Sequence, residues 1–291
     1  MANTRELRRR IKSIKNTAQI TKAMQMVAAT KMRKAQVQAL NGRAYVENLA
    51  QALERLLPKV DIESHALLSG NESHKSGIVL LSTDKGLVGA LNTNLMRSVL
   101  ASQTQASVFY TVGKKGRNFA VKTGKDLIAD FENADLVSLR QAVQLTKMIT
   151  EAFLAKELGE VYLIYPHFVS TLKQEPRKVK LLPIDYSGLD NLSTSKRDNN
   201  QSSNRANEFL FEPNVDSLLD FILIHHIQNT IYYALLETKA SEHSARMIAM
   251  QNATDNAKEI VDDLTLNYNQ TRQQSITNEL LEITTAQAAM Q

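Results

Sequence analysis

The sequence contains no cysteine and no tryptophan, and aromatic residues make up only 5% of its 291 residues. Without cysteine there is no disulfide framework, no thiolate metal site and no cysteine nucleophile. No apolar run reaches the roughly 18 residues that crossing a bilayer requires. A hydrophobic content of 43% that is poor in aromatics favours narrow seams between helices, where Ala, Leu, Ile and Met pack closely.

Proline and glycine are almost absent from both ends of the chain. All five prolines lie between Pro58 and Pro213, and nine of the ten glycines fall in the same stretch, with Gly42 as the exception. Proline and glycine destabilise a helix interior by roughly 3 and 1 kcal/mol relative to alanine. We therefore predict two very long helices, over residues 1–57 and 213–286, which flank a compact middle.

Each terminal segment carries a narrow stripe of mostly apolar residues at steps of three and four, the spacing of one helix face. The N-terminal stripe consists of Leu7, Ile11, Ile14, Ala18, Thr21, Gln25, Ala28, Met32 and Ala35. The C-terminal stripe consists of Ile224, Ile227, Ile231, Leu235 and Thr238, then Ala253, Ala257, Ile260 and Leu264, and finally Ile276, Leu280 and Ile283. Such stripes suit a coiled-coil seam. We predict that the two helices pack antiparallel, with self-association as the alternative, and that the seam weakens around residues 267–275.

Positive charge is concentrated at the N-terminus. Residues 1–46 carry eleven lysines and arginines against one acid, Glu6, although the whole chain has a net charge of only +5. Arg8, Lys12 and Lys15 fall beside the apolar stripe, so they are expected to be exposed. A basic face of this kind is a solvated flank of the coiled coil, a nucleic-acid-binding surface or a surface for an acidic protein. The segment lacks the interleaved aromatic residues that would favour nucleic acid.

The middle of the chain alternates short strands with helices. Predicted strands cover residues 78–81, 107–112, 127–131 and 161–165, with a closing hairpin-like pair at 168–172 and 179–184. Predicted helices cover 94–102, a short stretch from residue 114, and 135–157. This alternation predicts a Rossmann-like α/β domain over residues 75–190 with a mostly parallel sheet. Residues 191–208, which are rich in Ser and Asn, are predicted to form a polar loop.

The sequence gives little support for chemistry within this chain. Gly86 and Gly89 follow a predicted strand, but neither G-x-G-x-x-G nor G-x-x-x-x-G-K-[ST] occurs in the sequence. The six histidines do not show the spacing of a metal site, since His225 and His226 are adjacent and lie about 100° apart on a helix. We expect no cofactor, no metal and no catalytic residue. A nucleotide-binding enzyme is the disfavoured alternative.

Three blocks of sequence resemble the γ subunit of F-type ATP synthases. The first is RRRIKSIKNT at 8–17 with ITKAM at 20–24 and MVAA at 26–29, and the second is STDKGLVG at 82–89. The third comprises SE at 241–242, ARMIAM at 245–250, NATDNA at 252–257, RQ at 272–273, SIT at 275–277 and ELLEI at 279–283. The blocks follow the family's order along the whole chain. One departure is Val88, where the family commonly has cysteine.

The resemblance implies a central-stalk rotor subunit that is not itself an enzyme. The terminal helices would form an antiparallel, asymmetric coiled coil inside a ring of three α and three β subunits. The α/β domain would be a foot that grips the ε subunit and the membrane ring of c subunits, so that ion flow turns the shaft and drives the β sites through their conformations. Membrane association would be peripheral, at the cytoplasmic face of a bacterial plasma membrane.

The resemblance also implies which residues meet the neighbouring subunits. Met24, Lys31, Lys85 and Val88 would lie near an acidic lever on β, Arg272 and Gln273 would contact a loop of β, and Phe209, Phe211 and Glu212 would meet ε and the c-ring. Neither nucleic acid nor a small-molecule substrate is implied. The residues themselves leave open another class, a basic coiled-coil protein that binds nucleic acid or scaffolds partners.

Overall fold

The computed structural model describes residues 4–56, 65–101, 107–184 and 215–289, with the backbone alone for residues 39–44, 46–47, 50–56, 215–217 and 289. The chain forms two compact units. Unit 1 comprises residues 1–30 and 246–291, and unit 2 comprises residues 31–245.

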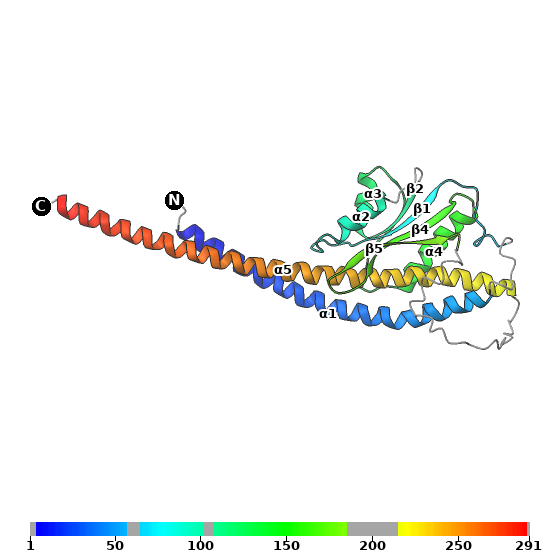
Figure 1. Ribbon diagram of the computed structural model, residues 1–291. Coiled ribbons are helices and arrows are strands. Elements are labelled where there is room, and N and C mark those ends of the chain that lie inside the picture. Colours follow the sequence, from blue (N-terminus) through cyan, green and yellow to red (C-terminus); the bar gives the residue numbers. More distant parts are fainter. Residues whose placement is uncertain (1–3, 57–64, 102–106, 185–214, 290–291) are drawn as a thin grey trace. The chain divides into compact units, whose positions relative to one another are not determined.

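Two long helices begin and end the described chain. Helix α1 covers Thr4–Leu56 and helix α5 covers Val215–Ala289, with 53 and 75 residues. Both are drawn as unbroken ribbons in Figure 1. The prediction of two long terminal helices is confirmed. Their length follows from the scarcity of glycine and proline in these segments, since the other residue types there cost far less in a helix interior.

In unit 1 the two helices pack along a narrow seam. The α1 side of the seam consists of Leu7, Ile11, Ile14, Ala18, Thr21, Gln25 and Ala28, all buried or half-buried, as the stripe predicted. The α5 side consists of Met250, Thr254, Ala257, Val261, Leu264, Tyr268, Thr271 and Ser275. The Thr21 and Thr254 hydroxyl oxygens lie 2.7 Å apart across the seam. Steps of four and three alternate throughout both sides, which is the coiled-coil repeat.

The predicted C-terminal stripe is wrong in part. Val261, 9% exposed, lies in the seam, whereas Ile260 is 46% exposed. The seam weakens over residues 267–275, as expected, because Tyr268, Thr271 and Ser275 are only half-buried, whereas Thr254, Ala257 and Val261 are buried. From Ile276 to residue 288 every side chain is exposed. The predicted stripe failed there because it followed apolar residues, while the seam at this level is built from hydroxyl-bearing and small residues.

Unit 2 contains a five-stranded sheet in the order β3-β2-β1-β4-β5. Its strands are β1 (Ser76–Leu81), β2 (Ser107–Val112), β3 (Asp126–Phe131), β4 (Glu160–Phe168) and β5 (Gln174–Leu182). The first four are parallel and β5 is antiparallel to β4, which confirms the mostly parallel sheet. The predicted strand at 168–172 is wrong. Strand β4 itself runs to Phe168, and residues 169–173 form the turn into β5, closed by a hydrogen bond from Ser170 N to Lys173 O of 3.0 Å.

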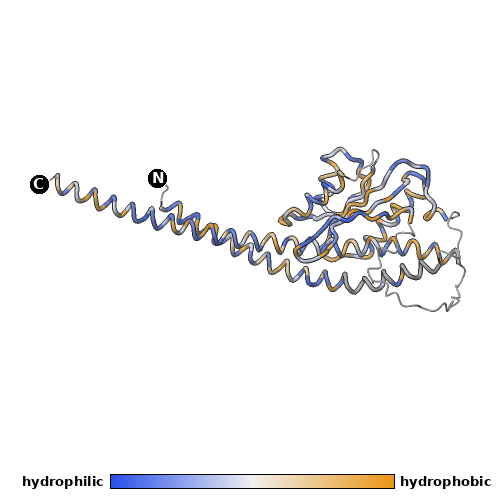
Figure 2. The backbone as a smooth tube through the Cα atoms, in the orientation of Figure 1, coloured by the Kyte–Doolittle hydropathy of each residue, from blue (hydrophilic) through white to orange (hydrophobic). Residues whose placement is uncertain are grey.

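Helices cover both faces of the sheet. Helices α2 (Leu91–Ala101) and α3 (Lys114–Lys122) share a core with Ile78, Leu80 and Phe109. Helix α4 (Leu139–Leu154) and residues 219–235 of α5 pack on the other face, against Val79 and Leu81. Because alternate residues of β1 point to opposite faces, a strand covered on both sides is apolar throughout. Figure 2 shows this concentration of hydrophobic residues in the central strands.

Candidate partner-binding surfaces

The basic face of α1 in unit 1 is exposed, as predicted. Arg8, Lys12, Lys15 and Lys22 all lie off the seam and are exposed. Met24, which is 37% exposed, lies about 200° around the helix from Lys22 and so belongs to another side of α1. The basic face of unit 1 carries fixed positive charge, which suits a partner with acidic groups.

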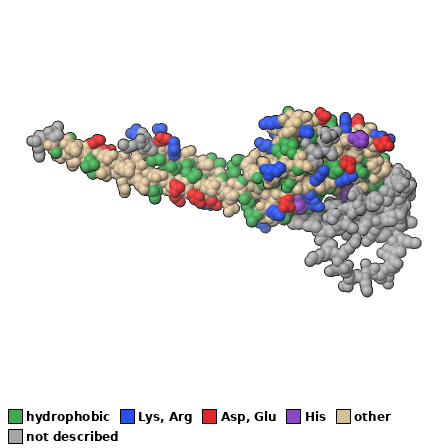
Figure 3. Space-filling view, turned by 45° about the horizontal axis from the view of Figure 1, so that its top comes forward, with side chains coloured by type: hydrophobic (Ala, Val, Ile, Leu, Met, Phe, Trp, Pro, Cys, Tyr) green, Lys and Arg blue, Asp and Glu red, His purple; other side chains and the backbone are tan. Residues whose placement is uncertain are grey.

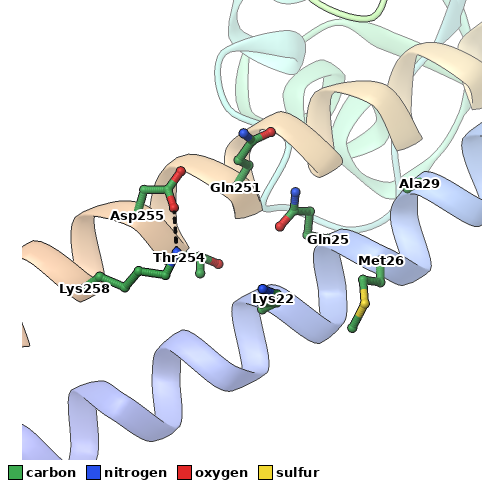
Figure 4. A pocket seen from close by; sticks show the side chains of 8 residues that line it. All are labelled: Lys22, Gln25, Met26, Ala29, Gln251, Thr254, Asp255 and Lys258. Carbon is green, nitrogen blue, oxygen red and sulfur yellow. Dashed lines mark hydrogen bonds and ion pairs between the residues drawn. The ribbon is translucent and has the colours of Figure 1, made fainter.

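A shallow cavity of about 300 Å³ lies between the helices of unit 1. It is lined by Lys22, Gln25, Met26, Ala29, Gln251, Thr254, Asp255 and Lys258. Figure 4 shows Lys22, Gln25 and Thr254 in the space between the two helices. The Lys258 ammonium lies 3.1 Å from the Asp255 carboxylate, and no ion pair of Lys22 occurs among the described residues. Sequence reasoning missed this cavity, since it arises from the register of the two helices.

Lys31 and Lys85 lie in unit 2 and both act on one carboxylate. The Lys31 Nζ atom is 2.7 Å from Asp135 Oδ2, and this ion pair is largely exposed. The hydrogen bond from Lys31 lowers the pKa of Asp135, and the nearby charges of Lys239 and Lys85 add to that effect. Lys85 itself is exposed. The structure thus brings two of the predicted residues together around Asp135.

Val88 is not available for a direct contact. Its side chain is 3% exposed and packs with Leu91 and Ala245. The exposed residue of this turn is Leu87, 58% exposed, whose φ of 62° lies in the left-handed region. The buried Val88 side chain therefore anchors the turn to Leu91 and Ala245, while Leu87 and Lys85 form the exposed surface of the turn.

Arg272 and Gln273 are exposed on α5 in unit 1, next to the seam position Thr271. Beyond them the helix exposes a group of large apolar side chains. Ile276, Leu280, Leu281 and Ile283 are 44%, 58%, 56% and 61% exposed. Contiguous apolar side chains on a soluble surface mark an interaction site. Phe209, Phe211 and Glu212 lie outside the described residues.

Among the described residues no group of three His, Asp or Glu side chains is placed to hold a metal ion. In the same part of the chain, no helix is both long enough and apolar enough to pass through a bilayer. On the face of the molecule that Figure 3 shows, lysines and arginines alternate with acidic side chains over the α/β unit. That face carries no uniform basic patch of the kind that holds a nucleic-acid backbone.

Residues 3–290 match a family model described as ATP synthase. The ATP synthase gamma chain of Methylacidiphilum infernorum is 44% identical over 295 residues that cover 100% of both chains. The gamma chain of Opitutus terrae is 43% identical and covers 99% of both. This chain belongs to the ATP synthase γ-chain family.

Solved structures agree with the γ-chain assignment. A chain of the Tetrahymena thermophila mitochondrial ATP synthase, from a structure of the central stalk and c-ring, matches with a TM-score of 0.60 and 26% identity, over 80% of this chain and 99% of that chain. A chain of the Euglena gracilis mitochondrial ATP synthase matches with a TM-score of 0.70 over 99% of this chain and 94% of that chain; at 19% identity it supports the fold alone. The γ-chain family favours a central-stalk subunit over the nucleic-acid-binding or scaffold alternative.

Proposed function

We propose that this γ-family chain is the rotor of the central stalk of an ATP synthase and has no catalytic site of its own. It turns inside a ring of α and β subunits and couples ion-driven rotation to conformational change at the β sites. The observation that carries this proposal is the end of α5. Helix α5 contributes buried seam residues as far as Val261, and from Ile276 to residue 288 every side chain is exposed, including four large apolar ones.

An exposed apolar helix end suits a rotating contact. Apolar contacts are non-directional, so a helix that is held by them resists sideways movement and still turns. Hydrogen bonds prefer narrow ranges of distance and angle. They therefore hold a rotating helix only at defined angles, and such a contact is called a catch here. Arg272 and Gln273 lie just before the apolar end and are exposed. We propose that Arg272 and Gln273 form such a catch with β, and that the apolar end of α5 contacts the surrounding ring of α and β subunits.

The basic face is the proposed contact for an acidic lever of β. The Lys22 ammonium in the cavity of unit 1 lacks an ion-pair partner among the described residues. Met24, on another side of α1, is a separate proposed contact of the lever. Attraction between exposed charges extends over about 8–10 Å at physiological salt, so it tolerates changes of angle during rotation. In unit 2, a carboxylate of the lever would compete with Asp135 for Lys31, beside Lys85.

The remaining partners follow from the family. We propose that Phe209, Phe211 and Glu212 belong to the contact with ε and the c-ring. Membrane association is then peripheral and occurs through the complex, at the cytoplasmic face of a bacterial plasma membrane.

The experiment is co-purification of this chain with α and β subunits, followed by assays of ATP hydrolysis and rotation. Because the chain has no cysteine, the variant Lys122→Cys provides a single attachment site in this chain at an exposed position of α3. With β fixed to a surface, ATP should drive rotation of a label at residue 122. The wild-type chain, treated in the same way, is the control for labelling. A chain that assembles while its label stays fixed during hydrolysis would contradict the proposal.

A further inference from the structure

One stretch of α5 in unit 2 is buried on all sides although most of its residues are polar. We call Glu237–Ser244 the polar segment. Every residue of this segment is buried, including Glu237, Lys239, Glu242 and His243 at 5%, 3%, 3% and 4% exposure. Burial of charged side chains is costly unless they are paired and hydrogen-bonded. The contacts of the segment therefore indicate a specific role.

One face of the polar segment is bonded to the end of β4 and the turn that follows it. Ser241 Oγ donates to Pro166 O at 2.8 Å, and Ser244 Oγ donates to Thr171 O at 2.7 Å. The Glu237 carboxylate lies 2.6 Å from His167 Nδ1. Positions 237, 241 and 244 follow the i, i+4, i+7 spacing, so they share one side of the helix.

The opposite face is bonded to the turn after β3. Residue 239 lies about 200° around the helix from residue 237, and Lys239 Nζ donates to Asn133 O at 2.9 Å. The same ammonium lies 3.2 Å from the Glu242 carboxylate. The helix is therefore held from two sides that belong to different strands.

The turn after β3 is itself firmly tied to the sheet. The Asn133 amide nitrogen, Nδ2, donates to Ser82 O at 2.6 Å, and the Asn133 backbone N–H donates to Asp84 Oδ2 at 3.1 Å. The other Asp84 oxygen accepts the backbone N–H of Lys114 at the start of α3, at 2.8 Å. A force on Lys239 thus reaches β1, β3 and α3 through hydrogen bonds.

These contacts all lie at the carboxyl ends of the parallel strands. Strands β2 and β1 lie between β3 and β4, so the distance from β3 to β4 is about 14 Å at the usual strand spacing. The diameter of a helix with its side chains is about 10–12 Å. Helix α5 therefore fits between the turn after β3 and the end of β4. In folds of this class ligands bind in the crevice outside the carboxyl ends, where the strand order reverses. Here the order reverses between β1 and β4, and the polar segment occupies that region.

We infer that the polar segment is the point at which torque passes between the α/β sheet and helix α5. This inference rests on the proposed rotor function. The apolar contacts of α5 with the sheet face are non-directional, so they hold the helix without fixing its angle about its own axis. The directional bonds of Ser241, Ser244, Glu237 and Lys239, made from opposite sides of the helix, fix that angle. The ligand crevice of the fold is thus used as a mechanical joint.

The test variant is Ser241→Ala combined with Ser244→Ala, which adds no volume. It removes the bonds to Pro166 O and Thr171 O, and also the 3.4 Å bond that Ser244 Oγ accepts from Gln174 Nε2. The matched control is Thr230→Val combined with Thr238→Val, because these hydroxyls donate to carbonyls of α5 itself, His226 O and Ala234 O. Both are compared with wild type in the assembled, membrane-bound complex. The readouts are ATP hydrolysis without load, ATP-driven ion pumping against an increasing gradient, and stall torque at a label on residue 122.

The serine variant should hydrolyse ATP normally without load, and it should lose pumping and stall torque as the load rises. A slip step is a rotation of α5 relative to the sheet that breaks the joint. The loss of each hydrogen bond should increase the rate of this step by up to about tenfold. The control should resemble wild type in all three readouts. A general loss of folding would instead reduce assembly and unloaded hydrolysis.

A second variant tests the joint by rescue. In the Ser241→Ala background, Ser244→Cys with Thr171→Cys introduces the only two thiols of this chain. In wild type the Ser244 hydroxyl donates to the backbone carbonyl of residue 171. Oxidation should restore pumping under load, and reduction should abolish it again. Equal stall torque in wild type and the serine variant, or no response to oxidation of a pair shown to be cross-linked, overturns the inference. If the wild-type chain neither assembles nor rotates, the proposed function fails instead.

Discussion

Buried His226 makes the stability of unit 2 dependent on pH. It is 7% exposed, and its Nδ1 atom has no hydrogen-bond partner among the residues that the structure describes. Burial lowers the pKa of His226 from 6.5 to about 4, because a charged imidazole loses its hydration there. The unfolded chain then binds a proton that the folded chain does not bind between these two values. The free energy of unfolding should therefore fall as pH decreases from about 6.5 to about 4.

The size of this effect follows from the two pKa values. A shift from 6.5 to about 4 corresponds to about 2 kcal/mol lost between pH 8 and pH 5, and about 3 kcal/mol lost by pH 4. The perturbation is His226→Leu, which removes the titrating group and fills the site with an apolar side chain. At pH 8 the variant should be at least as stable as wild type, since an unpaired buried nitrogen is removed.

The assay is urea unfolding of the purified chain, followed by circular dichroism at pH 8, 6 and 5. The difference in unfolding free energy between His226→Leu and wild type should grow by about 2 kcal/mol from pH 8 to pH 5. His74, which is exposed, provides the control, and His74→Leu should keep the pH dependence of wild type. Parallel curves for wild type and His226→Leu would refute the reasoning, because they would show that the buried imidazole does not titrate between the two values.

Three further predictions concern the rotor surfaces and the sheet. Replacing Arg272 and Gln273 together by Ala should weaken ATP synthesis in the reconstituted complex while the melting temperature stays unchanged, and unchanged synthesis counts against the proposed catch. Met24→Lys should lower the number of ions pumped per ATP, because an added charge would bind an acidic lever too strongly, and Met24→Leu is its control; equal coupling in both rejects the lever contact. Gly113→Ala should lower the unfolding free energy by about 2 kcal/mol or more, since φ is 99° and a Cβ would lie 2.4 Å from Ser82 O, and a wild-type urea midpoint would contradict this.

The seam of α1 could be predicted residue by residue. Every predicted position from Leu7 to Ala28 is buried or half-buried. The reason is that the steps of three and four continue through Thr21 and Gln25. The helical spacing therefore identified these two positions as part of the seam although both residues are polar. The basic residues between these positions left a single choice of inward face.

The seam of α5 was harder to predict because its inward face includes Thr254, Thr271 and Ser275, while some apolar residues such as Ile260 lie outside it. Ile260 and Val261 are adjacent, and only the register with α1 selects Val261 for the seam. Further along, Tyr268 and Thr271 are half-buried while Ile276 and Leu280 are exposed. Hydrophobicity predicts burial within a single chain. The same rule gives a wrong prediction where apolar side chains are exposed for contact with another subunit. The mismatch is therefore itself a sign of a partner surface.

The polar segment could not be predicted because nothing in its composition distinguishes a buried helix from a solvated one. Glu237, Lys239 and Glu242 are residues of an exposed helix surface by type, and their burial depends on contacts with His167 and Asn133, which are far away in the sequence. The two stretches of α5 thus differ in a way that fits a rotor. Where it meets the sheet, the helix is held by directional bonds on opposite sides; where it ends, it offers apolar side chains and few fixed partners. A shaft needs a joint that resists twisting at its driven end and a contact that permits rotation at the other, and one continuous helix meets both needs by changing the chemistry of its surface.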